Sequence, residues 1–166
     1  GFELFYDSPT GLRQLNKTKK LYAGNTGTPE YFRTDCKFTN GEPNSGRGFA
    51  GLILFGGYTD ALEYIGVELS DTLKEGVKYC GTFHIRAADS YMYIDQIGML
   101  ISEKKQYVDM WAPIFKSPQI LSKYSEPIVP ELGWLQVNAE FIASGNERFI
   151  TIGNFAEPDR HVKSIN

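Results

Sequence analysis

The sequence KYCGTFHIRAA at residues 78–88 decides the fold class, because apolar and polar side chains alternate along it. One face carries Tyr79, Phe83, Ile85 and Ala87, and the opposite face carries Cys80, Thr82, His84 and Arg86. This period of two is typical of a β-strand with one face on the core and the other in solvent. Residues 134–142 (WLQVNAEFI) repeat the pattern, with every second residue from Leu135 to Phe141 on the apolar face.

Further strands are expected on both sides of this stretch. Residues 48–55 are mostly apolar, residues 62–69 alternate, and residues 91–102 carry bulky side chains on both faces. The turn SGNE at 144–147 precedes a last clear strand over 148–155. Residues 103–133 contain four prolines and are expected to be irregular, and loops longer than about 15 residues are often functional. The first 50 residues are rich in turns, so that 2–6 and 30–33 can form only brief strands.

Composition and charge narrow the class of protein. With 166 residues the chain is long enough for one domain, and 42% hydrophobic residues with 14% aromatics are compatible with a packed core. Short strands without crossover helices indicate an all-β fold, a β-sandwich over residues 1–166. A net charge of −3 argues against a nucleic-acid partner. No apolar run approaches the roughly 20 residues that span a bilayer, so no membrane span is expected.

The residues of chemical interest do not form a recognisable catalytic motif. His84 and His161 match no nucleophile or metal spacing, so we expect no enzyme. Glu68 and Glu140 lie on polar strand faces and could in principle serve glycoside hydrolysis, but solvated acids are the commoner explanation. Cys36 and Cys80 belong to no Cys/His cluster, and the residues alone leave open two buried thiols or one disulfide.

Aromatic residues in loops favour a binding function. They comprise Tyr22, Tyr31 and Phe32 in a Gly/Pro/Thr-rich segment, and Tyr58, Tyr107, Trp111 and Tyr124 elsewhere. Exposed rings can stack on sugars, while the alternative is that they pack under their own loops. A second candidate is a polar patch of Glu68, Thr82, His84 and Arg86, whose alternative is an ordinary solvated sheet face. Carboxylates of Glu3, Asp7 and Asp35, with carbonyls near Arg47, could form an oxygen-rich calcium site.

Several phrases, in their order, resemble exported jelly-roll domains of Bacteroidetes-type bacteria. The phrases include GFE at 1–3, GTPEYF at 27–32 followed by Cys36, SGRGFAG at 45–51, KYC at 78–80, IDQIG at 94–98 and ITIGNF at 150–155. Such domains are similar to carbohydrate-binding modules and galactose-binding-like domains. They precede outer-membrane-protein-A-like or sorting domains in surface proteins.

The resemblance implies a jelly roll of galactose-binding-like type that is extracellular or associated with the outer membrane. The resemblance names no ligand, but together with the loop aromatics it favours a non-catalytic module that binds a glycan at the cell surface. The alternative is a structural or adhesion module of a cell-envelope protein that binds protein partners. The resemblance also implies a disulfide between Cys36 and Cys80, and a structural calcium ion held through Glu3 beside the Arg47 turn.

The chain departs from the family pattern in two respects. Leu21 stands where such domains usually carry Trp, which removes one stacking platform. No closing strand with an acidic pair follows the ITIGNF phrase. Residues 1–166 are therefore expected to form one jelly-roll domain, which is either a fragment of a larger surface protein or has disordered ends.

Overall fold

The computed structural model describes residues 21–33, 41–54, 62–88, 92–94, 96–109, 112–124, 128, 132–155 and 162–164, with backbone alone for 92–94 and 162–164. Every element named in this part of the chain is a β-strand. The strands are β1 (Leu21–Ala23), β2 (Glu30–Arg33), β3 (Gly48–Gly51), β4 (Ile65–Glu68), β5 (Lys78–Ile85), β6 (Met92–Ile94), β7 (Gln96–Ser102), β8 (Ile120–Lys123), β9 (Leu135–Ile142), β10 (Phe149–Gly153) and β11 (Val162–Ser164). The all-β prediction is confirmed.

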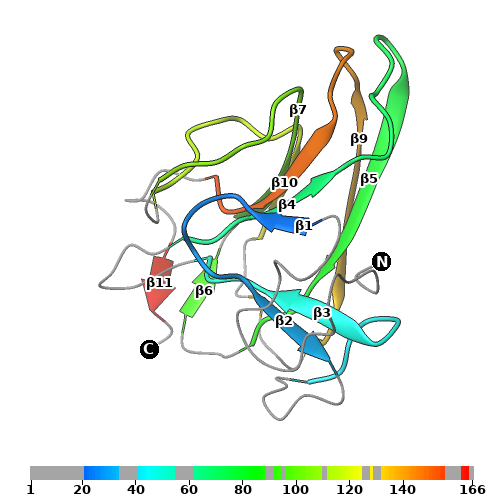
Figure 1. Ribbon diagram of the computed structural model, residues 1–166. Helices are drawn as coiled ribbons and strands as arrows, with labels where there is room; N and C mark the ends of the chain where they lie inside the picture. Colours follow the sequence, from blue (N-terminus) through cyan, green and yellow to red (C-terminus); the bar gives the residue numbers. More distant parts are fainter. Residues whose placement is uncertain are drawn as a thin grey trace.

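The strands pair into antiparallel sheets (Figure 1). A five-stranded sheet, here the main sheet, has the order β1-β4-β10-β7-β8. The two long strands β5 and β9 form a ribbon beside it, in register from Lys78 opposite Ile142 to Ile85 opposite Leu135. The hairpin β2–β3 and the pair β6–β11 form smaller sheets.

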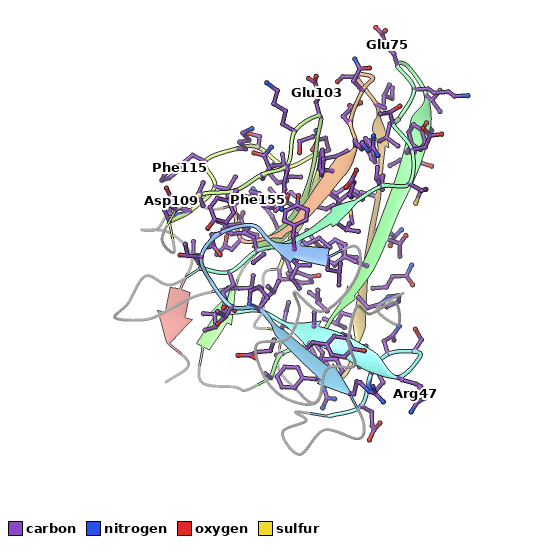
Figure 2. All side chains as sticks on the ribbon, in the orientation of Figure 1. Arg47, Glu75, Glu103, Asp109, Phe115 and Phe155 are labelled. Carbon is purple, nitrogen blue, oxygen red and sulfur yellow. The ribbon has the colours of Figure 1, made fainter. Side chains whose placement is uncertain are left out.

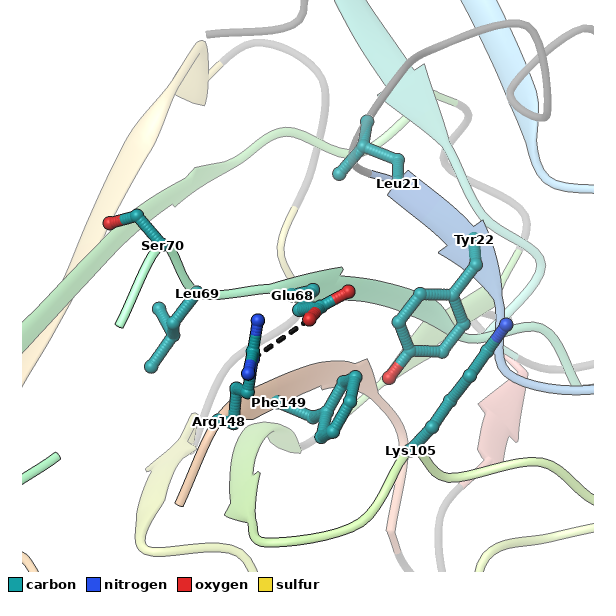
Figure 3. A pocket seen from close by; sticks show the side chains of 8 residues that line it. All are labelled: Leu21, Tyr22, Glu68, Leu69, Ser70, Lys105, Arg148 and Phe149. Carbon is teal, nitrogen blue, oxygen red and sulfur yellow. Dashed lines mark ion pairs between the residues drawn. The ribbon is translucent and has the colours of Figure 1, made fainter. Parts of the chain in front are cut away.

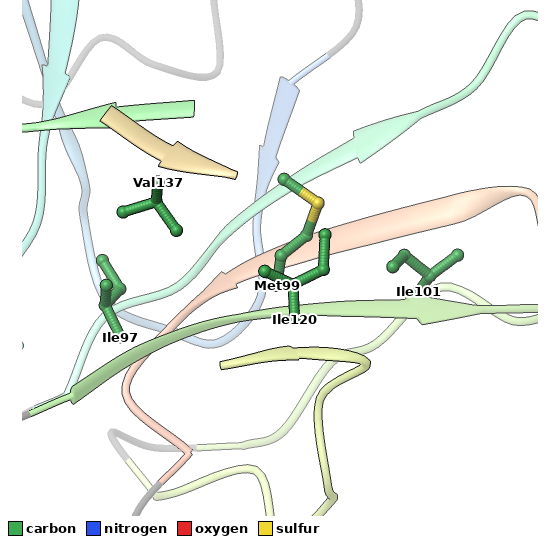
Figure 4. Packing of buried hydrophobic residues seen from close by; sticks show 5 residues of the cluster. All are labelled: Ile97, Met99, Ile101, Ile120 and Val137. Carbon is green, nitrogen blue, oxygen red and sulfur yellow. The ribbon is translucent and has the colours of Figure 1, made fainter. Parts of the chain in front are cut away.

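The β5–β9 ribbon packs over the main sheet, which is consistent with a β-sandwich. The cluster between the two layers consists of Ile97, Met99 and Ile101 of β7, Ile120 of β8 and Val137 of β9 (Figure 4). Phe83 and Phe141 pack against it, so the predicted inward faces of residues 78–88 and 134–142 are confirmed. At Gly81 the layers approach so closely that a Cβ would overlap the Ile120 side chain.

The other face of the main sheet is also covered. Leu62, Tyr64, Leu100 and Ile114 form a second buried cluster, against which Val108 and Phe155 pack. The Tyr64 hydroxyl donates to the Asn154 carbonyl at 2.7 Å and accepts the Ile114 N–H at 3.0 Å. Tyr64 is therefore buried on the face of the main sheet that also carries Glu68, and Val108 and Ile114 are among the residues that cover it.

Strand β8 lies within residues 103–133, which the sequence predicted to be irregular throughout. Tertiary contacts stabilise it: Ile120 pairs with Met99 of β7. Just before it, the Gln119 side-chain amide accepts the Ile101 N–H at 2.7 Å and donates to the Ile101 carbonyl at 2.8 Å. The Gln119 amide thus extends the hydrogen-bond ladder between β7 and β8 by one step before the first residue of β8. Strand β8 has only four residues, and so short a stretch shows too little alternation to predict a strand from sequence.

Candidate functional site

An open cleft of about 350 Å³ lies where β1, β4 and β10 meet the loop after β7 (Figure 3). We call it the edge cleft. It is lined by Leu21 and Tyr22 of β1, Glu68 of β4, Leu69, Ser70, Lys105, Arg148, and Phe149 of β10. Tyr22 and Glu68 are two of the binding residues predicted from sequence, although they were assigned to separate candidate sites.

Strand register brings the cleft residues to one face of the main sheet. Tyr22 pairs with Gly66, and Glu68 lies two residues further along β4, on the same face. Phe149 of β10 pairs directly with Glu68. Because the face alternates with a period of two, all three side chains project to the side that Tyr64 also occupies. The edge cleft lies on this face, beside Glu68.

The Tyr22 ring is held on both faces and at its edge. It lies flat over Gly66, where a Cβ would overlap the ring. The Lys105 ammonium lies 4.2 Å from the ring centroid, and it must be on the other face because Gly66 fills the first. Phe149 packs edge-on to the ring, with centroids 6.4 Å apart. The ring therefore packs on Gly66 with one face, and Lys105 covers the other face.

The Tyr22 hydroxyl is not available to a ligand. Its oxygen is buried and, like Thr151 Oγ1, has no hydrogen-bond partner in the described part of the chain. Burial is the main cause that raises the Tyr22 pKa. Thr151 and the Gln106 backbone lie near enough to lower that pKa in part, but neither meets hydrogen-bond geometry. Tyr22 therefore offers a ring surface only.

Charged groups line the opposite side of the cleft. Arg148 Nε lies 2.8 Å from Glu68 Oε1, and both side chains are about half exposed (49% and 48%). Such an exposed pair contributes little to stability, typically about 0–1 kcal/mol. The bond uses only one nitrogen of the guanidinium, so its terminal N–H groups can still donate to a ligand.

The loop that carries Lys105 has a defined shape. The Lys104 carbonyl accepts hydrogen bonds from Ser102 Oγ at 2.9 Å and from Gln106 Nε2 at 2.6 Å. The Val108 N–H donates to the Gly24 carbonyl at 3.0 Å, which ties the loop to the end of β1. No carboxylate among the described residues pairs with Lys105.

The predicted polar patch does not form as one surface. Thr82, His84 and Arg86 are exposed on the outer face of the β5–β9 ribbon, opposite or beside Asn138 and Gln136 of β9. Glu68 belongs to the main sheet and lies in the edge cleft instead, so its grouping with these residues was wrong. Alternation placed each residue on the correct kind of face, but it carries no information about which sheet a strand joins.

The aromatic predictions have mixed outcomes. Tyr31 is only 1% exposed, so its predicted stacking on a ligand was wrong; a buried ring has no face to offer. Phe32 stacks on Phe49 at 5.2 Å, and Phe49 packs edge-on against Trp134 at 5.7 Å. This cluster joins the β2–β3 hairpin to the start of β9. Phe32 thus follows the alternative interpretation, in which loop aromatics pack against the protein. Tyr58 and Trp111 lie outside the described residues.

The metal and disulfide predictions fall largely outside the described residues, which include neither Glu3 nor Cys36. Arg47 is exposed in the turn before β3 (Figure 2). No group of three His, Cys, Asp or Glu side chains that could hold a metal occurs among the residues searched. Cys80 is a free, exposed thiol on the outer face of β5, so the structure does not contain the predicted bond.

Sequence reasoning missed Ser70, Lys105, Arg148 and Phe149. The one available signal was the length of the 103–133 segment, which contains Lys105.

No protein-family model, curated protein or solved structure matches the chain. Within the described ranges, no helix is long and apolar enough to cross a membrane.

Proposed function

We propose that the protein is a non-catalytic glycan-binding module and that the edge cleft holds the sugar. The observation that carries the proposal is the Tyr22 ring, which lies beside the Glu68–Arg148 ion pair in a cleft of about 350 Å³. Ligand pockets generally begin at about 300 Å³ and combine aromatic walls with a few polar groups.

The groups in the cleft suit the chemistry of a sugar. A pyranose has apolar C–H faces that pack on an aromatic ring, and hydroxyls at its edge that need donors and acceptors. The free Glu68 oxygen can accept from hydroxyls, and the Arg148 terminal nitrogens and Ser70 can donate to them. The β-ladder holds Tyr22, Glu68 and Phe149 in place, so that little ordering entropy is lost on binding.

The same geometry disfavours a glycosidase. Hydrolysis by paired carboxyls requires two acids about 5–9.5 Å apart. Of the described residues that line the edge cleft, Glu68 is the one acid, and Arg148 pairs with it. Glu140 lies on β9 and forms an ion pair with Lys78 at 2.9 Å. Among the described residues that line the cleft there is therefore no second acid to pair with Glu68, which favours binding over hydrolysis.

The location and the finer fold assignment rest on the family resemblance. We propose on that basis that the sandwich is a jelly roll of galactose-binding-like type, displayed outside the inner membrane. The structure supports the coarser statement, an all-β fold consistent with a β-sandwich. Its partner would then be a glycan or another component of the cell envelope.

A glycan array followed by calorimetry tests the proposal. We expect Tyr22→Leu to weaken binding of the best glycan by up to about tenfold, since one aromatic contact contributes roughly 0.5–1.5 kcal/mol. Glu68→Gln is a second variant that removes a charge from a half-exposed position and should leave the fold intact. His84→Ala, on the outer face of the β5–β9 ribbon, is the matched control and should bind like the parent. If no glycan binds at millimolar concentration, the proposal is wrong.

An adhesion module is the second candidate, favoured by exposed aromatics in the segment after β7. Phe115 is 72% exposed and Tyr107 is 54% exposed. Figure 2 shows Phe115 at the surface of this segment. A protein partner bound here would be lost in Phe115→Ser but retained in Tyr22→Leu. Co-purification of a purified envelope protein with each variant separates this function from glycan binding.

A further inference from the structure

Among the described residues, the side chains that line the edge cleft carry one positive charge more than negative charges, on a negatively charged protein. The charged side chains of the cleft are Glu68, Lys105 and Arg148. Glu68 and Arg148 neutralise each other across 2.8 Å, which leaves Lys105. The whole chain has a net charge of −3, so a cationic site runs against its overall charge.

The position of Lys105 determines which ligands can use the Tyr22 ring. The ammonium covers the one accessible ring face at 4.2 Å from the centroid. A neutral sugar must displace Lys105 before it can stack, and it gains no charge interaction in return. An anionic sugar can bind the ammonium as it leaves the ring, so the displaced charge is compensated by the ligand.

We infer that the ligand is an acidic saccharide whose carboxylate pairs with Lys105. This inference rests on the proposed function and specifies its substrate class. Arg148, on the opposite side of the cleft, can donate from its terminal nitrogens to the hydroxyls of the same sugar. The hydrogen bonds from Ser102 and Gln106 to the Lys104 carbonyl fix the loop from which Lys105 projects. Glu103, on the same loop, is exposed and forms no ion pair with Lys105 in the described structure.

The test compares sugars that differ in charge alone. The probes are oligomers of galacturonate, mannuronate, guluronate and glucuronate, each paired with its methyl ester, together with neutral oligosaccharides. Calorimetry at low and high salt gives the affinity of each member. We expect the best acid to bind about fivefold tighter than its ester, near the upper end of what one exposed ion pair contributes. The difference should shrink in 1 M salt, where the Debye length falls to about 3 Å.

Two lysine variants locate the charge. Lys105→Met should abolish the preference for the acid, so that the acid and its ester bind equally, because the ammonium that pairs with the carboxylate is gone. Lys104→Met removes the neighbouring exposed lysine outside the cleft and should retain the preference. Loss of the preference in both variants, or in neither, overturns the assignment to Lys105.

The outcomes separate this inference from the proposed function. Binding of a neutral glycan through Tyr22 with no preference for acids refutes the acidic ligand and leaves glycan binding standing. Absence of binding to every probe, acidic or neutral, refutes both.

Discussion

Replacing Val137 with Ala tests whether the β5–β9 ribbon packs on the main sheet as described. Val137 is 3% exposed and lies in the cluster with Met99 and Ile120, between the two layers. The substitution removes two methyl groups, about 1.6 kcal/mol at roughly 0.8 kcal/mol each. The space left behind adds a cavity term, so that we expect a total loss of about 2–3 kcal/mol in the free energy of unfolding.

This loss should be readily measurable. For a chain of this length each kcal/mol shifts the Tm by about 2–4 °C, which predicts a fall of roughly 5–10 °C. Urea denaturation should show the same loss with an unchanged m-value, because the surface exposed on unfolding is the same. Ile142→Ala is the matched control on the same strand: its side chain is 67% exposed on the opposite face, and the change should stay within about 0.5 kcal/mol. Equal effects of the two substitutions would refute the assigned faces of β9 and, with them, the sandwich.

Four further predictions concern single groups. Thr151→Val should raise the unfolding free energy by about 1 kcal/mol in urea titrations, since Thr151 is 0% exposed and its hydroxyl has no described partner; a loss of stability would mean that the hydroxyl is satisfied. Burial raises the pKa of Tyr22 and Tyr64 above 10.0, so the unfolded chain ionises first. The stabilisation that the two neutral hydroxyls give the folded state is therefore complete below pH 10.0 and is lost as the pH rises above 10.0. The Tm should fall over that range, and Tyr22→Phe should make the fall less steep. Cys80 should react with a thiol reagent in the native protein as fast as a small-molecule thiol, and a reaction that needs denaturant would contradict its exposure. If the protein binds the calcium ion that the resemblance implies, its Tm should be higher in excess calcium than in excess chelator. Identical Tm values would contradict a calcium site.

The candidate site was predictable only in part. Tyr22 was identified as an aromatic residue in a turn-rich segment and Glu68 by its strand face, and both line the edge cleft. Their proximity could not be inferred, because it depends on the pairing of β1 with β4. Arg148 and Phe149 were recognised only as the start of a strand, and their role follows from the register that places Phe149 opposite Glu68. Tyr31 shows the reverse case, since a turn-rich context suggested exposure and the hairpin with β3 buries the ring.

The all-β class and the inward and outward faces of residues 78–85 and 135–142 were predictable from the residues alone. The sequence also located the turn at 144–147, where Gly145 and Asn146 adopt positive φ of 93° and 70° and the Glu147 carboxylate accepts the Ser144 N–H. These features are local: alternation and turn residues act over a few neighbours along the chain. Only the tertiary structure decided the strand order, the existence of β8, the second covered face of the main sheet, and the edge cleft with Lys105 over Tyr22. These features depend on contacts between residues such as Tyr22, Glu68 and Phe149, which are distant in sequence and meet only when the strands pair.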